Sequence, residues 1–293
     1  MTPSAHLQGE AWGARVLDWV QVQQPTIRPA YRAVLDELGP WTGLPVLDLG
    51  CGAGEFAALA GGRGARASGL DACAPLVAIA RRRNPAGAFV VGDMEHLLFP
   101  DGAFSVVTAF NSLHFADDPV AALGEAIRVT RPGGHLVVAA WGPPHECDAV
   151  TYLLDLGALM PPPDVTSSRW DATDLGALQT LLGRYGLSLS SWRVVACPWE
   201  FSDLPTALRG LLSTGPAAQA ISHSGWSRVA DAVTASIAPY RRRDGSYLLS
   251  NTCHYLIATQ TDGAPPAGPA PSSQVRPSQS NERGDGEHQT RPG

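Results

Sequence analysis

The stretch Val46-Leu-Asp-Leu-Gly-Cys-Gly-Ala-Gly-Glu55 decides the fold of this chain. Its first half is a short apolar run of the kind that forms a buried strand, and three glycines at alternate positions follow it directly. Glycine adopts positive φ angles and lets a ligand approach the backbone closely. Helical sequence continues from Glu55, so the loop would end at a helix N-terminus with free N–H groups. The stretch therefore predicts a strand, a ligand-binding loop and a helix in succession.

Strand-like and helical patterns alternate beyond this loop. Further apolar runs predict strands at 65–71, 88–92, 104–110 and 135–141. Between them, helical patterns occupy 55–60, 75–83 and 119–130, and Pro132-Gly-Gly134 predicts a tight turn before the last of these strands. This alternation indicates an α/β fold with a doubly wound parallel sheet and right-handed crossovers.

The flanking segments have other patterns. Helical spacing appears within 11–24 and 28–38, and later at 149–160 and 175–185, while 187–201 and 253–260 have the composition of strands. Two insertions, at about 143–175 and 202–250, interrupt the alternation. Residues 262–293 are rich in Pro, Ser and Gly and lack apolar clusters, so we predict a disordered tail.

Composition excludes several classes of function. All 21 basic residues among the 293 are Arg, so a P-loop lysine and a lysine Schiff base are excluded. The 27 acidic residues give a net charge of −6, which argues against a protein that coats nucleic acid. Five scattered cysteines without a CxxC pair predict neither a metal site nor a disulfide framework. Without a signal peptide or an apolar run of membrane-spanning length, we expect no membrane association and a cytoplasmic location.

Three acidic residues stand where predicted strands end. Asp48 precedes the glycine loop, Asp71 closes the next strand, and Asp93 closes the third. The carboxyl ends of parallel strands meet at the crevice where doubly wound folds bind ligands, and a carboxylate there can accept hydrogen bonds from ribose hydroxyls. The glycines form GxGxG, whereas the dinucleotide fingerprint GxGxxG requires glycine where Glu55 stands. The loop therefore favours a ligand that carries a positive group over a pyrophosphate.

The segments LDLGCGAGE, GLD, VGDMEHLLFPDGAFSVVTAFNSLHF and RVTRPGGHLVVAAWG together resemble the class I S-adenosylmethionine-dependent methyltransferases, most closely the small-molecule group called methyltransferase type 11. The resemblance covers about residues 40–142. It implies a Rossmann-like, mostly parallel sheet of seven strands with an antiparallel last strand at 253–260. It also implies a methyltransferase domain over 41–261, an N-terminal helical lid over 1–40, and a substrate cap formed by the two insertions.

The resemblance further implies roles for individual residues. The methionine part of S-adenosylmethionine would be surrounded by Asp48, Gly50, Cys51, Gly52 and Gly54. The ribose would be held by Asp71 with Ala72 beside it, and the adenine by Asp93 and Met94. Asn111 would lie at the sulfonium end.

His114 follows Asn111 by three residues and is a candidate general base; the alternative is a polar loop residue or one that packs beside Phe115. Trp12, Trp19 and Tyr31 could belong to the lid or pack on the sheet edge. The tryptophans of the insertions could line an acceptor pocket or belong to the core; they are Trp170, Trp192, Trp199 and Trp226.

The sequence thus predicts an enzyme that transfers a methyl group from S-adenosylmethionine to a small-molecule acceptor. Such a transfer needs alignment of donor and acceptor rather than a covalent enzyme intermediate, which agrees with the absence of a nucleophile motif. Two alternatives remain open at this point. One is an NAD-dependent oxidoreductase on a related fold, and the other is a protein that binds S-adenosylmethionine without catalysis.

Overall fold

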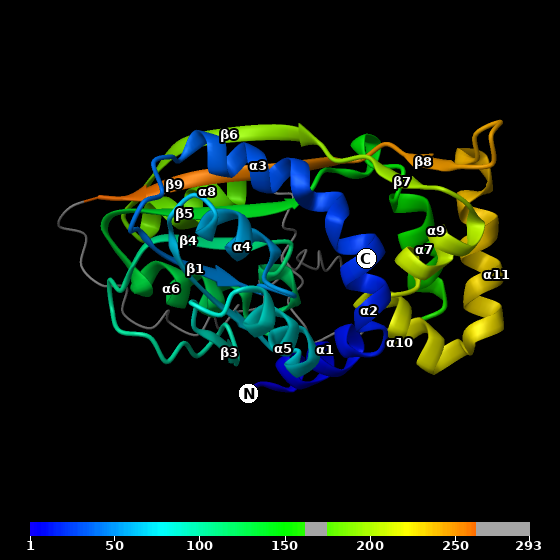
Figure 1. The fold of residues 1–293 in the computed structure, drawn as a ribbon, viewed down its shortest axis with the longest axis horizontal. Coiled ribbons are helices and arrows are strands. Elements are labelled where there is room, and N and C mark those ends of the chain that lie inside the picture. The colour runs from blue at the N-terminus through cyan, green and yellow to red at the C-terminus, as the bar shows by residue number, and fades with distance from the viewer. Residues whose placement is uncertain (162–174, 262–293) are drawn as a thin grey trace, which may run out of the picture.

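The computed structural model describes residues 1–161 and 175–261, and a seven-stranded sheet forms their centre (Figure 1). The strand order is β3-β2-β1-β4-β5-β9-β6, in which β9 runs antiparallel to both of its neighbours. The strands are β1 (Pro45–Leu49), β2 (Arg66–Asp71), β3 (Phe89–Val91), β4 (Phe104–Phe110), β5 (Thr130–Trp141), β6 (Leu187–Ala196) and β9 (Thr252–Gln260). This arrangement confirms the predicted fold class, including the antiparallel last strand.

Alternate residues of β1 face opposite sides of the sheet, and both sides are covered. Val46 belongs to the apolar cluster beneath α3 and α4, whereas Leu47 and Leu49 belong to the cluster beneath α6 and α8. A strand buried on both faces appears in sequence as a nearly continuous apolar run, as β1 and β4 do. The covering helices are α3 (Arg28–Glu37), α4 (Glu55–Gly61), α5 (Ala74–Arg83), α6 (Pro119–Val129) and α8 (Leu175–Arg184).

Three predicted elements differ from the structure. The run 187–201 is divided into β6 and β7 (Trp199–Phe201), because Pro198 cannot donate to a ladder and the amide of Cys197 binds the carbonyl of Asn251 at 2.7 Å. The turn at 132–134 is instead a bulge within β5, where the register against β4 shifts. The helix predicted within 11–24 is α1 (Pro3–Gly13), which begins eight residues earlier, followed by short helical turns.

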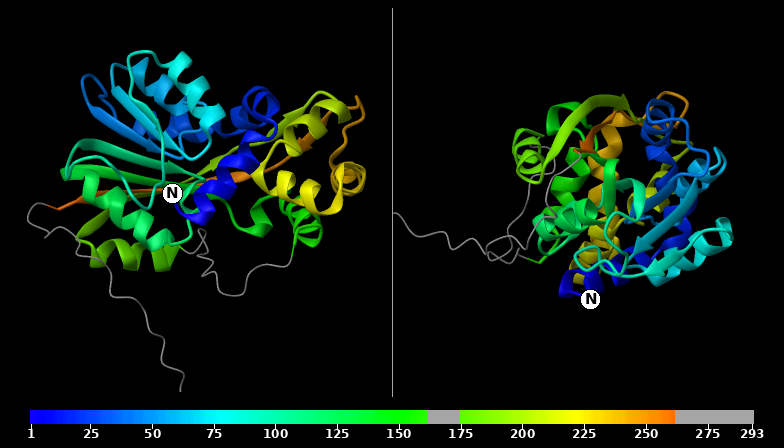
Figure 2. Two further views of the ribbon diagram at one scale, coloured as in Figure 1. Left: turned by 90° about the horizontal axis from the view of Figure 1, so that it is seen from below. Right: turned by 90° about the vertical axis from the view of Figure 1, so that its left-hand side faces the viewer.

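The two insertions pack together as one cap. Helices α7 (Val150–Ala158), α9 (Leu204–Leu211), α10 (Gly215–Ser224) and α11 (Trp226–Ile237) share a single apolar cluster. β7 pairs with β8 (Tyr247–Leu249) in a separate two-stranded sheet beside them. Figures 1 and 2 show this cap at one end of the molecule, away from the seven-stranded sheet.

The N-terminal segment lies between the sheet and the cap (Figures 1 and 2). After α1 and the short α2 (Val16–Asp18), the chain forms a π-helical turn at Trp19–Gln23 and a 3-10 turn at Gln24–Ile27 before α3. Helix α1 contacts α5 on one side and α10 on the other, and the π-helical turn contacts α9. The first 27 residues therefore connect the sheet module to the cap.

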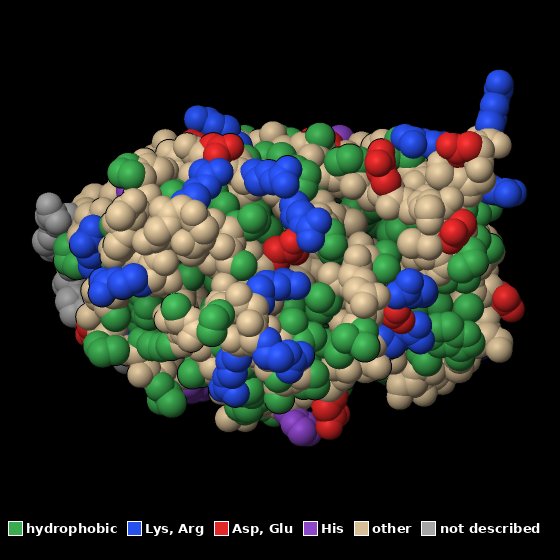
Figure 3. All heavy atoms as spheres, in the orientation of Figure 1, with side chains coloured by type: hydrophobic (Ala, Val, Ile, Leu, Met, Phe, Trp, Pro, Cys, Tyr) green, Lys and Arg blue, Asp and Glu red, His purple; other side chains and the backbone are tan. Residues whose placement is uncertain are grey.

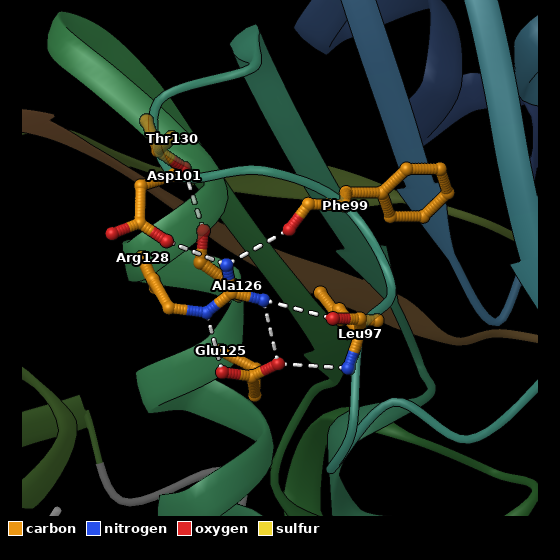
Figure 4. Close-up of polar contacts among 7 residues, drawn as sticks. All are labelled: Leu97, Phe99, Asp101, Glu125, Ala126, Arg128 and Thr130. Carbon is orange, nitrogen blue, oxygen red and sulfur yellow. Dashed lines mark hydrogen bonds and ion pairs between the residues drawn. The ribbon is translucent and has the colours of Figure 1, made fainter.

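Arg128, in the last turn of α6, holds the loop that follows β3 (Figure 4). Its guanidinium donates to the carbonyl oxygens of Leu97 and Phe99 at 2.9 and 2.8 Å and pairs with Asp101 and Glu125. Glu125 in turn accepts from the amide of Leu97 at 2.7 Å. These contacts fix the loop that carries Asp93 and Met94 to the body of the sheet.

On the face shown in Figure 3, arginine side chains are spread among acidic and apolar ones rather than gathered into one basic patch. Within residues 1–161 and 175–261, the helices are all too short or too polar to cross a bilayer. The same ranges contain no group of three or more His, Cys, Asp or Glu arranged to hold a metal ion. The predicted tail, Trp170 and most of the segment that links α7 to α8 lie outside the described residues.

Candidate functional site

Backbone hydrogen bonds attach the glycine loop to the end of β2. The amides of Gly50 and Cys51 both donate to the carbonyl of Leu70, at 2.8 and 3.0 Å. Gly50 has a φ of +70°, and a Cβ there would lie 2.4 Å from the Cβ of Ser112, so no other residue fits this position. The loop thereby passes close under the segment that follows β4 and leaves its backbone open on one side.

Asp71 ties this loop to the next one. One oxygen of its carboxylate, Oδ2, accepts from the amide of Gly52, and the other, Oδ1, accepts from the amide of Cys73, each at 2.8 Å. Burial raises the pKa of Asp71, while both amide bonds lower it in part. Each oxygen keeps further lone pairs for a ligand, so the carboxylate is held in place and remains able to accept hydrogen bonds.

Asp48 lies deeper than Asp71. Its side chain is 3% exposed, and Thr108 donates to its Oδ1 at 2.7 Å. Burial raises the pKa of Asp48 to about 7, and the neighbouring charge of Asp71 acts in the same direction. The group is therefore partly protonated at neutral pH and supports the loop from below.

Asp93 binds the start of the chain. Its carboxylate accepts from the amide of Thr2 at 2.6 Å and from the amide of Glu95 at 3.0 Å. Burial acts to raise the pKa of Asp93, but these backbone bonds outweigh it and hold the pKa below the usual value. The carboxylate therefore remains ionised and anchors α1 over the edge of the sheet.

Asn111 is the only described non-glycine residue with a positive φ, at +50°. Such a conformation is uncommon and tends to occur at functional positions. Its amide donates to the carbonyl of Ala139 at 2.8 Å, and its buried side-chain Oδ1 has no hydrogen-bond partner within the described part of the chain. A buried amide oxygen without a partner is unfavourable unless a ligand or water satisfies it.

These elements surround a cavity of about 640 Å³. Of the residues proposed from sequence, those that line it are Gly50, Gly52, Asp71, Ala72, Met94, Asn111 and His114. The remaining ones, Asp48, Cys51, Gly54 and Asp93, are not among its described lining residues. The buried Cys51 packs between β2 and the helices above it, where burial raises the pKa of its thiol, and Gly54 lets α4 approach Ala80 of α5.

His114 lies in the 3-10 turn after β4, with its ring 4.1 Å from that of Phe115. His114 lines the cavity and is exposed by its surface area, and desolvation by the surrounding protein lowers the pKa of the imidazole to about 4. The ring is therefore neutral at pH 7. This places an uncharged proton acceptor beside Asn111.

The N-terminal segment supplies lining residues that the sequence did not reveal. Gln23 and Gln24 are each 3% exposed and line the cavity, and the Oε1 atom of each lacks a partner among the described residues. The amide of Gln24 lies beside Gly52, where an added Cβ would be 3.2 Å from its Nε2. Gln23 ends the π-helical turn and Gln24 begins the 3-10 turn after it, and two buried amides at such a junction are a signal of function, because π-helical turns are frequent at functional sites.

Some of the aromatic residues singled out from the sequence line the cavity, and others are exposed away from it. Trp12, Trp19 and Tyr31 all line the cavity, and the ring of Trp12 stands edge-on to that of Trp19 at 4.6 Å. Trp199 of the cap lines it as well. In contrast, Trp192 and Trp226 are 49% and 44% exposed and lie elsewhere. Trp12 and Trp19 thus pack against each other, whereas Tyr31 packs on Phe56 and Phe110 of the sheet module, and all three line the site.

Glu55, which takes the place of the third fingerprint glycine, forms an ion pair with Arg28. Its charge is therefore balanced at the start of α4. Repulsion of a pyrophosphate by this carboxylate is therefore weaker than the sequence alone indicates, whereas the third glycine of the dinucleotide fingerprint is still missing.

The sequence model of the family described as "Methyltransferase domain" matches residues 47–138. A demethylmenaquinone methyltransferase from Beutenbergia cavernae is 44% identical over 113 residues, which cover 39% of this chain and 47% of that protein. A malonyl-[acyl-carrier protein] O-methyltransferase from Serratia marcescens is 38% identical over 92 residues, covering 31% of this chain and 36% of that protein. The chain thus spans less than half the length of these curated relatives.

Solved structures agree on the fold. A protein from Bacillus halodurans C-125 superposes with a TM-score of 0.54 at 16% identity, covering 79% of this chain and 98% of that one. The YcgJ protein from Bacillus subtilis gives a TM-score of 0.53 at 20% identity, covering 80% and 99%. At these identities the likeness concerns the arrangement of helices and strands.

Proposed function

Residues 47–138 match the methyltransferase-domain family, and we propose from this premise that the chain is an S-adenosylmethionine-dependent methyltransferase acting on a small-molecule acceptor. One observation supports this most strongly. The open backbone of the glycine loop, the fixed carboxylate of Asp71 and the unpartnered Oδ1 of Asn111 all belong to residues that line one cavity.

The residues present fit the cofactor. Gly50 provides a cradle that any Cβ would fill, and Asn111 and Gln24 offer buried amide oxygens without partners in the described chain. An ammonium group of a bound amino acid would satisfy such oxygens, because each of its N–H bonds is a donor. When bound, S-adenosylmethionine supplies an electrophilic methyl group whose bonding pair stays on sulfur.

The proposed positions follow the chain order of the motifs. Gly50, Gly52 and Gly54, together with Asp48 and Cys51, surround the methionine part of the cofactor. Asp71 accepts hydrogen bonds from the ribose with Ala72 beside it, and Asp93 and Met94 hold the adenine. Asn111 lies at the sulfonium end. In this arrangement the residues that do not line the cavity act through the loops that they stabilise.

His114 is the proposed proton acceptor. Because its pKa of about 4 keeps the imidazole neutral, one of its two ring nitrogens carries no hydrogen and can accept a proton from the acceptor at pH 7. The same low pKa means that the proton passes on to solvent rather than remaining on the ring. This base is weak, so alignment of the reactants contributes more to the rate than proton removal.

The remaining parts of the chain support this chemistry. Residues 1–40 are the proposed lid, because they supply one wall of the cavity and contact both modules. The cap selects the acceptor, as a small molecule free or bound to a carrier; the curated relatives are named for both kinds. All five cysteines are unpaired and buried, which agrees with a cytoplasmic enzyme.

Calorimetric titration with S-adenosylmethionine, S-adenosylhomocysteine and NAD tests the proposal. We expect micromolar affinity for the first two ligands and no binding of NAD. Binding of NAD alone would overturn it in favour of an oxidoreductase. Cofactor binding without turnover on a broad panel of hydroxyl, amine and carbon acceptors would favour a protein that binds the cofactor without catalysis.

A further inference from the structure

Aromatic and aliphatic side chains of the cap form the wall of the cavity opposite the glycine loop. Trp141, Trp199 and Tyr152 all line it, at the end of β5, in β7 and in α7. The rings of Trp141 and Trp199 are 5.3 Å apart at 78°, and those of Trp199 and Tyr152 are 6.0 Å apart at 64°. Such edge-to-face arrangements present ring faces and edges that can stack on a planar ligand. These residues lie outside the span that matches the methyltransferase domain.

This wall has no charge. Among the described residues that line the whole cavity, Asp71 is the only one that is ionisable apart from His114, Tyr31, Tyr152 and Cys147. His114 is neutral because its pKa is about 4. The arginines that flank the N-terminal wall, Arg15 and Arg28, form ion pairs with Asp18 and Glu55. An anionic or cationic acceptor would therefore lose its hydration at the cap without gaining a counter-charge there.

Two polar side chains of the cap wall are already engaged, whereas the buried Nε1 of Trp199 has no hydrogen-bond partner within the described part of the chain and is left as a free donor. Asn251 accepts from the amide of Ala149 at 3.0 Å and donates to the carbonyl of Leu249 at 3.1 Å. The hydroxyl of Tyr152 is hydrogen-bonded to the side chain of Thr214. Consequently the cap contacts a ligand mainly through apolar surface.

We infer that the cap side of the cavity is an acceptor compartment for an uncharged, planar aromatic molecule. This inference rests on the proposed function, because it requires the glycine-loop side to hold the cofactor. Aromatic walls select for flat apolar ligands, and the uncharged surroundings exclude carboxylates and ammonium groups. The acceptor group itself lies toward Asn111 and His114, where the two sides meet.

The test uses the full chain saturated with S-adenosylhomocysteine and three probes with the same ring. Calorimetry measures binding of 1-naphthol, which is neutral, 1-naphthoate, which is anionic, and 1-naphthylmethylamine, which is cationic at pH 7. We expect 1-naphthol to bind at least tenfold more tightly than either charged probe. A preference for a charged probe overturns the inference, and so does the absence of binding by all three.

A pair of substitutions on α7 locates the compartment. Leu153 lines the cavity at its rim and is 39% exposed, whereas Leu154 beside it is 69% exposed and is not among the lining residues. Leu153→Arg should weaken 1-naphthol binding and strengthen 1-naphthoate binding, each at least fivefold. Leu154→Arg should change neither. Equal effects of both substitutions would show a general effect of surface charge and overturn the inference.

A second pair of substitutions keeps the inference testable if the arginine variants do not fold. Trp199→Phe reduces the aromatic wall and should weaken 1-naphthol binding about threefold, while Trp226→Phe, at an exposed position of the cap, should not. The affinity for S-adenosylhomocysteine distinguishes a wrong acceptor class from a wrong proposed function. If it is normal and no probe prefers the compartment, the acceptor class is wrong; if the natural protein does not bind it at all, the proposed function is wrong.

Discussion

The glycine loop and the cap face one another across the same cavity, and they hold their shapes by different means. In the loop, backbone amides of Gly52 and Cys73 bind the Asp71 carboxylate, and positive φ angles set the path of the chain. In the cap, buried rings and aliphatic side chains pack around Trp199 and Tyr152. Backbone geometry demands particular residues at particular spacings, whereas apolar packing accepts many combinations of similar volume. A site of the first kind therefore leaves a motif in the sequence, and a site of the second kind does not.

The largest expected effect concerns the buried carboxyl beneath the loop. Because burial raises the pKa of Asp48 to about 7, above the value of about 3.9 in an unfolded chain, the native state binds this proton more tightly. Native stability should then fall as the pH rises from about 4 to about 7 and stay level above that. Asp48→Asn keeps an oxygen for Thr108 and removes this penalty, so it should gain about 4 kcal/mol over the natural protein at pH 8, since each unit of pKa difference corresponds to about 1.4 kcal/mol.

Urea unfolding between pH 4.5 and 8 measures this difference. The gain should shrink to about 1 kcal/mol at pH 4.5, where the carboxyl is protonated in the native state and still mostly ionised in the unfolded chain. A difference that does not vary with pH would mean that the carboxyl is ionised in the native protein. The loop would then contain a second charge instead of a neutral support.

The next effect concerns cofactor affinity. Asp71→Ala should weaken S-adenosylhomocysteine binding about a hundredfold, because hydrogen bonds to charged groups contribute roughly 1.5–3 kcal/mol and the loop also loses its tie to Gly52. Asp36→Ala, at an exposed position paired with Arg63, is the control and should leave the affinity unchanged. Equal affinities of the Asp71→Ala and natural proteins would remove the ribose from its proposed position.

A smaller effect concerns the loop after β3. Arg128→Ala should lower the free energy of unfolding by about 2 kcal/mol, because it leaves Glu125 and the carbonyls of Leu97 and Phe99 without their partner. Removing only the exposed partner, by Asp101→Ala, should cost no more than about 0.5 kcal/mol. Chemical denaturation of both variants distinguishes the clamp from an ordinary surface ion pair, for which the two losses would be similar.

The smallest effect tests whether the two sides are independent. Tyr152→Phe removes the hydroxyl that binds Thr214 and should cost about 1 kcal/mol of stability by thermal unfolding. Its affinity for S-adenosylhomocysteine should stay within twofold of the natural value. A tenfold loss would mean that the cap also shapes the cofactor side.

Local sequence predicts the elements around the loop because each depends on neighbours in the chain. The strand at 45–49, the glycine turn and the helix from Glu55 follow from an apolar run, glycine conformations and helical spacing within 20 residues. The start of α1 was also readable, since Thr2 caps it and Pro3 occupies its first position. The prediction of a helix within 11–24 did not use this capping signal and therefore placed the start of the helix too late.

Contacts between distant segments could not be predicted in the same way. The hydrogen bond from the amide of Thr2 to Asp93 joins residues 91 positions apart, and no pattern in either segment predicts it. Likewise, Gln23 and Gln24 are buried where a π-helical turn passes into a 3-10 turn between the sheet and the cap, and this burial depends on segments far away in the sequence. The role assignments of Asp48 and the other site residues stay predictions, because the structure gives their positions and not their ligands.

The position of β9 has a consequence for how the protein is made. Residues 252–260 lie between β5 and β6, so until they leave the ribosome those two strands have no partner to join them. All of the cap sequence emerges before that moment, and chains fold from the N-terminal end during synthesis. Until then the nascent chain exposes two unpaired strand edges, which are prone to aggregation. Pairing of β9 with β5 and β6 closes both edges at once. A translational pause just before β9 would therefore prolong the time during which these edges are exposed.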